Sequence, residues 1–157
     1  MKTVANLAFL MLALTAGVCA SAQTRAPASE KSSTPATAGP MKIIIKTDKR
    51  ELTATLDDNA TAKAFAQLLP LDLTLENYAS AEKIGYLPKK LATEDASDAP
   101  GRAGEIAYYA PWGNVAFFYR DFRYSRDLVK LGKLDSGIEE FRRTGAIKVR
   151  IELAKQP

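Results

Sequence analysis

Short segments in which apolar and polar residues alternate recur from residue 42 to residue 153. The clearest is 146–153, where Ile147, Val149, Ile151 and Leu153 alternate with charged residues. Successive side chains of a β-strand point to opposite faces, so this pattern predicts strands with one buried face. Seven strands are expected, at 42–46, 51–56, 71–76, 105–109, 115–120, 128–134 and 146–153. The sequence therefore predicts a mainly β fold.

Two short helices are expected beside these strands. Asp57, Asp58 and Asn59 supply N-cap side chains, and Phe65 begins an apolar stripe across 60–69. Residues 136–143 predict a second helix that ends before Gly145. Residues 93–103 are rich in polar residues, Pro and Gly and predict a loop. Seven strands with two helices favour a small β-barrel or a highly curved sheet whose ends the helices cap.

The first 40 residues predict an export signal and a linker. Lys2, the apolar stretch 4–18 and Ala20-Ser21-Ala22 match a secretory signal peptide cleaved near Ala22. The apolar stretch is shorter than the ~20 residues of a spanning helix, so no stable membrane anchor is expected. A retained anchor and lipidation at Cys19 remain alternatives. Residues 23–40 predict a disordered Ala/Pro/Ser/Thr linker, and 41–157 a domain in the periplasm or outside the cell.

The absence of histidine excludes several kinds of catalytic and metal-binding site. The chain has no His and one Cys, at position 19. This excludes Ser-His-Asp triads, Cys-His pairs and His-ligated zinc. The glycines form no phosphate-binding loop, so neither a cofactor nor a metal is expected. The net charge of +4 is too small to indicate nucleic-acid binding.

Several strings resemble the cyclophilins and their relatives. Residues 131–139 (Leu-Gly-Lys-Leu-Asp-Ser-Gly-Ile-Glu) resemble a late strand-to-helix passage of cyclophilins. The opening 41–45, the string 82–87 and the string 104–114, which contains Tyr-Tyr-Ala-Pro-Trp-Gly-Asn, resemble small bacterial and archaeal cyclophilin-like domain proteins of unknown function. This resemblance covers nearly all of 41–153. It implies a closed barrel of about eight strands, one more than the periodicity predicts. It also suggests association with a redox partner, because some members accompany flavodoxin-like domains.

The aromatic residues between Tyr108 and Tyr124 are the best candidate for a site. In a hairpin, alternation places Tyr108 and Phe117 on one face and Tyr109, Phe118 and Arg120 on the other. Two interpretations are open: the cluster is core, or its outer part forms a groove for an extended peptide or a small ligand. The candidate ligand-binding residues are Tyr86, Tyr109, Trp112, Asn114, Phe118 and Arg120, with Arg120 as the polar anchor.

The leading functional hypothesis is an exported binding domain without catalytic activity. The alternative is a periplasmic peptidyl-prolyl cis-trans isomerase, which needs only an Arg and an apolar pocket to hold a twisted amide. Phe118-Tyr119-Arg120 resembles part of the cyclophilin string that carries this Arg, although it comes late in the chain. Weaker hypotheses are an acid pair formed by Glu82 and Asp121, and calcium binding at Asp95 and Asp98. The basic residues Arg120, Arg123 and Arg126 are either a solvated edge or a docking patch for an acidic partner or anionic lipid.

Overall fold

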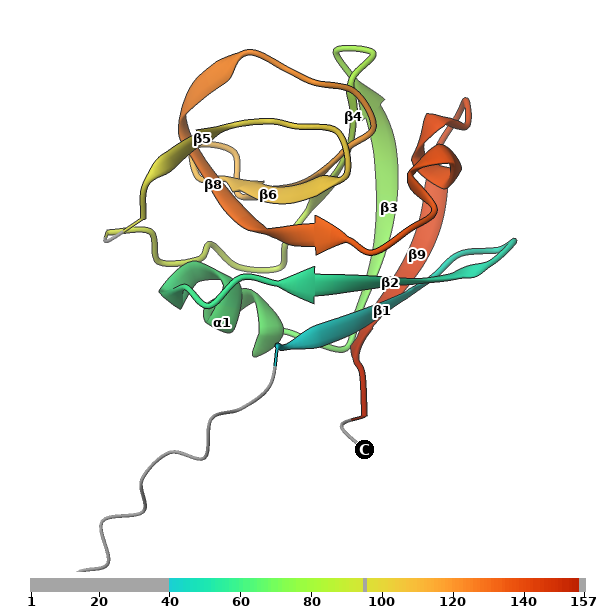
Figure 1. Cartoon of the computed structure of the whole chain (residues 1–157), viewed down its shortest axis with the longest axis horizontal. Coiled ribbons are helices and arrows are strands. Elements are labelled where there is room, and N and C mark those ends of the chain that lie inside the picture. The colour runs from blue at the N-terminus through green and yellow to red at the C-terminus, as the bar shows by residue number, and fades with distance from the viewer. Residues whose placement is uncertain (1–39, 95, 156–157) are drawn as a thin grey trace, which may run out of the picture. The chain divides into compact units, whose positions relative to one another are not determined.

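The fold is a closed antiparallel barrel. The computed structural model describes residues 40–94 and 96–155, so the predicted signal peptide, nearly all of the predicted linker and Asp95 lie outside the described residues. The strands are β1 (Lys42–Lys46), β2 (Glu51–Leu56), β3 (Leu71–Tyr78), β4 (Glu82–Tyr86), β5 (Asp98–Pro100), β6 (Glu105–Tyr109), β7 (Asn114–Phe118), β8 (Tyr124–Leu134) and β9 (Ile147–Leu153). They run in the order β2-β1-β9-β3-β4-β7-β6-β8 around the barrel, with β5 added to β8 (Figure 1). The predicted mainly β barrel of about eight strands is confirmed.

The barrel closes between β2 and β8. Leu56 pairs with Gly132, and Ala54 pairs with Leu134. At Gly132 the two backbones lie so close that an added Cβ would stand 2.8 Å from the Leu56 Cα and against the Thr55 carbonyl oxygen. A glycine at this position is what allows the two strands to meet.

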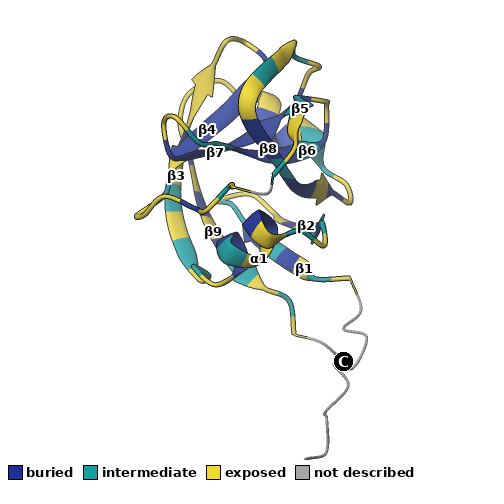
Figure 2. Ribbon diagram, turned by 90° about the vertical axis from the view of Figure 1, so that its left-hand side faces the viewer, coloured by how far each residue is buried: buried dark blue, intermediate teal, exposed yellow. Residues whose placement is uncertain are grey.

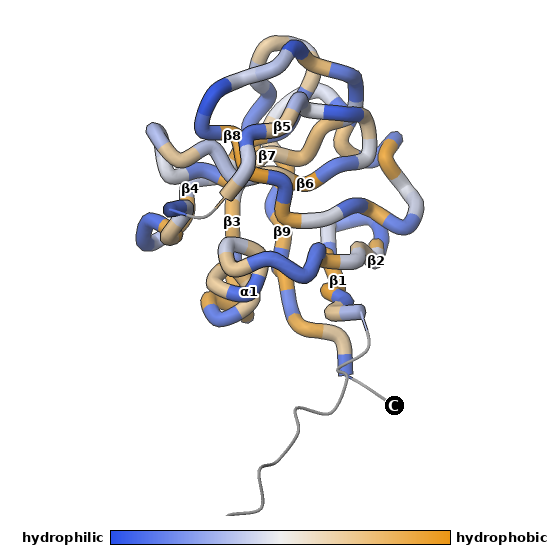
Figure 3. The backbone as a smooth tube through the Cα atoms, turned by 60° about the vertical axis from the view of Figure 1, so that its left-hand side comes forward, coloured by the Kyte–Doolittle hydropathy of each residue, from blue (hydrophilic) through white to orange (hydrophobic). Residues whose placement is uncertain are grey.

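Alternation along the strands fills the barrel interior. In β9, Ile147, Val149 and Ile151 are buried while Lys148 and Arg150 are exposed. Figure 3 shows the same alternation of hydrophobic and hydrophilic segments along β9. The largest interior side chains include Phe65, Tyr108, Phe117 and Phe141, and Phe117 stacks on Phe141 at 4.9 Å between ring centroids.

One α-helix and one 3₁₀ turn accompany the barrel, so the prediction of two capping helices is wrong. Helix α1 (Ala60–Ala66) begins after Asn59, whose Oδ1 accepts a hydrogen bond from the Ala62 amide at 2.8 Å. The second segment forms the 3₁₀ helix η1 (Ile138–Arg142). Its N-cap is Gly137, which offers no side chain to accept the free amides. The buried Glu140 is bonded to Thr47 and Arg143, which fixes this short turn against the β1–β2 connection.

Two strands lack the alternating pattern and were missed by the sequence analysis. Strand β4 is buried on both faces over Glu82–Gly85, and β5 has only three residues. Figure 2 shows the buried colour along β4 and β7. Strand β8 begins at Tyr124, four residues earlier than predicted, and β7 ends at Phe118. Among the described residues, no helix is both long and apolar enough to cross a membrane.

Candidate functional site

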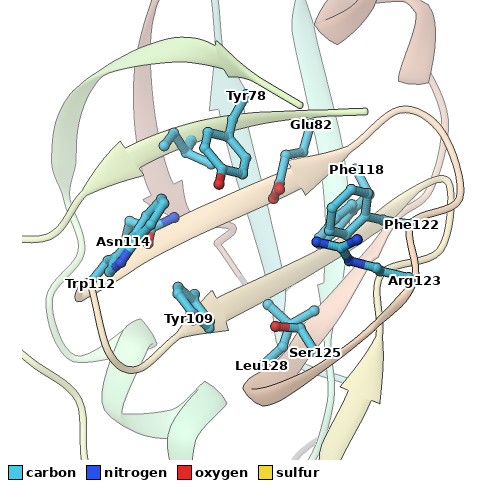
Figure 4. A pocket seen from close by; sticks show the side chains of 11 residues that line it. Tyr78, Glu82, Tyr109, Trp112, Asn114, Phe118, Phe122, Arg123, Ser125 and Leu128 are labelled. Atoms are coloured by element: carbon cyan, nitrogen blue, oxygen red, sulfur yellow. The ribbon is translucent and has the colours of Figure 1, made fainter. Parts of the chain in front are cut away.

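A pocket of about 160 Å³ lies on the outer face of the barrel (Figure 4). Its floor comes from β4, β7 and β6, and part of its wall from residues 119–127, called here the covering segment. The lining residues are Tyr78, Glu82, Ile84, Tyr109, Trp112, Asn114, Phe118, Phe122, Arg123, Ser125 and Leu128. The volume is close to that of an engineered protein cavity that binds benzene, so it suits a single ring or one side chain.

Strand register brings the floor residues together. Glu82 pairs with Phe118, and Asn114 pairs with both Tyr86 and Tyr109. These residues share the outer face, because the residues between them, such as Phe117, belong to the barrel interior. The pocket is therefore a direct consequence of the alternation that builds the core.

Three aromatic rings form one wall. The Trp112 ring lies edge-to-face against Tyr78 and Tyr109, with centroids 5.3 and 5.4 Å apart. Trp112 sits in the β6–β7 turn, which Gly113 closes with a φ of 71° and an amide bonded to the Tyr109 carbonyl at 2.9 Å. Trp112 is 45% exposed and Tyr78 40% exposed, so both rings are accessible.

The covering segment forms the opposite wall. Phe122 stacks on Phe118 at 6.4 Å, and the Arg123 guanidinium lies 5.6 Å from the Phe122 centroid. The Phe122 amide donates to the Gly101 carbonyl at 2.7 Å. The Asp98 carboxylate accepts from the Tyr124 hydroxyl and the Asp127 amide, which ties the segment to β5.

Two polar side chains are buried in the pocket without partners. Glu82 is 6% exposed, and none of the side-chain hydrogen bonds or ion pairs within residues 40–94 and 96–155 involves it. Burial alone raises the pKa of Glu82 from 4.5 to about 7. Asn114 is 2% exposed, and its Oδ1 has no hydrogen-bond partner in the described part of the chain. Figure 4 shows both side chains directed into the pocket.

Four of the six predicted site residues line this pocket. They are Tyr109, Trp112, Asn114 and Phe118, although Phe118 is almost fully buried as the floor beneath Phe122. Tyr86 is 61% exposed and does not line the pocket. Arg120 does not line it either, because its guanidinium donates to the Ser80 carbonyl at 3.4 Å.

Sequence reasoning missed Tyr78, Phe122 and Arg123 as pocket residues and considered Glu82 only as part of an acid pair. Arg123, not Arg120, brings a guanidinium to the pocket. The sequence carried no pattern that marked Glu82, because β4 is buried on both faces over Glu82–Gly85 and does not alternate. Phe122 belongs to the aromatic cluster and Arg123 to the basic run that the sequence singled out, but neither was chosen as a ligand-binding residue. For Tyr78 no local signal existed, because it lies about 30 residues before that cluster.

Other chemical candidates do not assemble around the pocket. Asp121 accepts a hydrogen bond from the Ala103 amide and does not line the pocket with Glu82. Lys83 is not available to the pocket either, because it points into the barrel and donates to the Gly145 carbonyl. Across the described ranges, no group of three or more acidic or Cys side chains is placed to hold a metal ion.

Comparisons with known proteins agree with this architecture. A family model described as the cyclophilin-like family matches residues 45–152. The solution structure of a hypothetical protein from Archaeoglobus fulgidus is similar, with a TM-score of 0.53 and 17% identity over 73% of this chain and 95% of that one. A search of curated proteins found no match. The family model covers more than half of the chain, and the chain therefore belongs to the cyclophilin-like family.

Proposed function

We propose that the protein is an exported binding domain that holds a small ligand, or one side chain of an extended peptide, in the outer pocket, without catalysing a reaction. Two side chains inside an aromatic pocket carry this proposal: Asn114, whose buried Oδ1 has no hydrogen-bond partner among the described residues, and Glu82, a buried residue whose carboxyl makes no side-chain hydrogen bond or ion pair there. Buried polar groups normally have hydrogen-bond partners, and a bound ligand supplies them here.

The accessible aromatic rings support binding. Trp112 and Tyr78 keep two-fifths or more of their surface exposed. Aromatic rings in this state are typical of sites that gain affinity by burying apolar area on binding. Export is proposed because residues 1–22 have the pattern of a signal peptide. A mature chain starting at Gln23 in the periplasm of a producing bacterium supports export, and an intact Met1 contradicts it.

The test is titration with benzyl alcohol and with a short Ala-Ala-Pro-Phe peptide. Trp112 is the only tryptophan, so its fluorescence reports on the pocket. We expect saturable binding with a Kd of about 1 mM for the one-ring alcohol, and amide shifts centred on Tyr109, Trp112 and Asn114.

Two variants separate the pocket from the rest of the surface. Trp112→Ala should weaken binding of both probes, measured by amide shifts because the variant has no tryptophan. It should cost only about 1–2 kcal/mol of stability, because the ring is 45% exposed. Tyr86→Ala is the matched control: it removes an exposed aromatic ring that does not line the pocket, and binding should not change. If the Trp112→Ala variant binds both probes with the same affinity as the native chain, the assignment of the site is wrong.

A second candidate is peptidyl-prolyl isomerase activity, favoured by one observation. The Arg123 guanidinium lies beside an apolar floor of Ile84, Phe118 and Leu128, and an Arg next to a proline-sized pocket is what this reaction needs. A protease-coupled assay on the same peptide decides between the proposals. Rate enhancement that Arg123→Gln abolishes supports the isomerase proposal. If micromolar protein gives no enhancement, the isomerase proposal fails and the proposal of a non-catalytic binding domain stands.

A further inference from the structure

We infer that the pocket selects a protonated amine attached to a single ring or short apolar group, with the Glu82 carboxylate as its counter-ion. This inference rests on the proposed function, because it names the ligand class of the same pocket. It follows from the missing partners of Glu82, from the charges around it and from the aromatic walls.

The first argument is the contrast between two equally buried glutamates. Glu140 is 4% exposed and contacts Arg143, Arg50 and Thr47. Glu82 is 6% exposed and has no such partner among the described residues. An isolated buried carboxylate is costly, and a charged donor offsets that cost best.

The second argument is the position of the charges. The titratable groups that line the pocket with Glu82 are Tyr78 from β3, Tyr109 from β6 and Arg123 from the covering segment. Arg123 is exposed at the rim over Phe122 and has no nitrogen within 4.0 Å of Glu82. The interior of the pocket therefore presents the carboxyl group of Glu82. Arg123, the only positively charged side chain in the lining, lies at the rim.

The third argument is the surface around the carboxylate. The rings of Tyr78, Tyr109, Trp112 and Phe118 line the same pocket as Glu82. Aromatic faces attract cations as well as apolar groups. Both parts of a ligand that carries an ammonium group on an apolar ring therefore find favourable contacts on these walls. Asn114 adds an amide that can turn either its oxygen or its nitrogen toward the ligand. The volume of about 160 Å³ limits the ligand to about one ring.

The experiment compares three one-ring probes of similar size: benzylammonium, benzyl alcohol and benzoate. Each is titrated at about pH 8, where an alkylammonium is still protonated, with Trp112 fluorescence and amide shifts as readouts. We expect benzylammonium to bind about tenfold more tightly than benzyl alcohol, and benzoate to bind most weakly. Glu82→Gln should remove the preference for the amine, so that benzylammonium and benzyl alcohol bind this variant with similar affinity.

A pH series supplies an independent signature. Burial holds the Glu82 carboxyl partly protonated near pH 7. Benzylammonium affinity should therefore rise between about pH 6 and pH 8 in the native chain and stay flat in Glu82→Gln. Arg123→Gln is the opposing variant: it removes the positive charge at the rim and should strengthen benzylammonium binding. Thermal unfolding of both variants confirms that they fold.

The outcomes distinguish failure of the amine inference from failure of the proposed binding function. If benzoate binds most tightly and Arg123→Gln abolishes its binding, the site takes an anion and the amine inference is wrong. If the three probes bind equally, the inference is wrong and the binding function remains. If none of the probes gives a saturable response in the native chain, the proposed binding function itself fails.

Discussion

At the scale of single residues, the ionisation of Glu82 links the pocket to stability. Below about pH 4.5 its carboxyl is protonated in both the folded and the unfolded chain, so burial carries no ionic penalty. Between about pH 4.5 and 7 the unfolded chain ionises first, because burial raises the folded pKa to about 7. The free energy of unfolding should therefore fall across this range, by about 3 kcal/mol in all.

Glu82→Gln should abolish this loss. Urea unfolding at about pH 5 and pH 8 should show the variant gaining about 2–3 kcal/mol on the native chain at the higher pH, since glutamine stays neutral. Glu94→Gln, at an exposed position, is the matched control and should leave the pH dependence unchanged. An equal pH dependence in native and Glu82→Gln chains contradicts the burial of an unpartnered carboxyl.

The residues that the sequence could identify are those controlled by alternation. Period-two reasoning placed Tyr108 and Phe117 on one face and Tyr109 and Phe118 on the opposite face, and the structure confirms this separation. It could not identify Arg123 in place of Arg120, because strand β7 ends at Phe118 and the alternation stops with it. The covering segment then takes its direction from contacts with Gly101 and Asp98, which are distant in sequence.

At the scale of elements, the seam between β2 and β8 makes a sharp prediction. Gly132→Ala should cost about 2–3 kcal/mol, because the new methyl group meets the backbone of Thr55 and Leu56. The Asp57 amide, which donates to the Leu131 carbonyl at 2.9 Å, should then exchange with solvent faster. Urea unfolding and amide exchange by NMR measure the two effects.

Gly145→Ala is the comparison that separates crowding from backbone strain. Gly145 has a φ of 79°, and nothing lies within 4 Å of an added Cβ. This variant should cost only about 1 kcal/mol, the penalty of the left-handed conformation, and should leave the seam protected. A larger loss at Gly145 than at Gly132 contradicts the seam argument.

Strands with one solvent-exposed face were predictable from the sequence, and strands buried on both faces were not. β9 alternates cleanly, whereas β4 has Lys83 and Gly85 directed inward and Glu82 and Ile84 under the covering segment. The 3₁₀ turn was predicted as a helix because its residues suit one, but Gly137 and the contacts of Glu140 limit it to five residues.

At the scale of the whole molecule, residues 41–157 should fold without the preceding chain. The family model matches 45–152, and the Met41 carbonyl accepts a hydrogen bond from the Leu56 amide at 2.8 Å, so the fragment has to begin at Met41. We expect the same unfolding midpoint for the fragment and for the full chain in a thermal melt. A lower midpoint for the fragment contradicts the predicted domain boundary.

Closure of the barrel was implied by the resemblance to a family, since alternation alone is equally compatible with a strongly curved open sheet.

The strand order around the barrel places β1 opposite β7. The chain enters the domain at β1 and leaves it at β9, where the Ala154 amide donates to the Lys42 carbonyl at 2.9 Å. Both ends of the domain thus lie next to each other on β1 and β9 (Figure 1), and β1 lies across the barrel from β7, the strand that begins with Asn114. A bead, a sensor chip or a fused module attached at either end would leave the mouth of the pocket facing open solution.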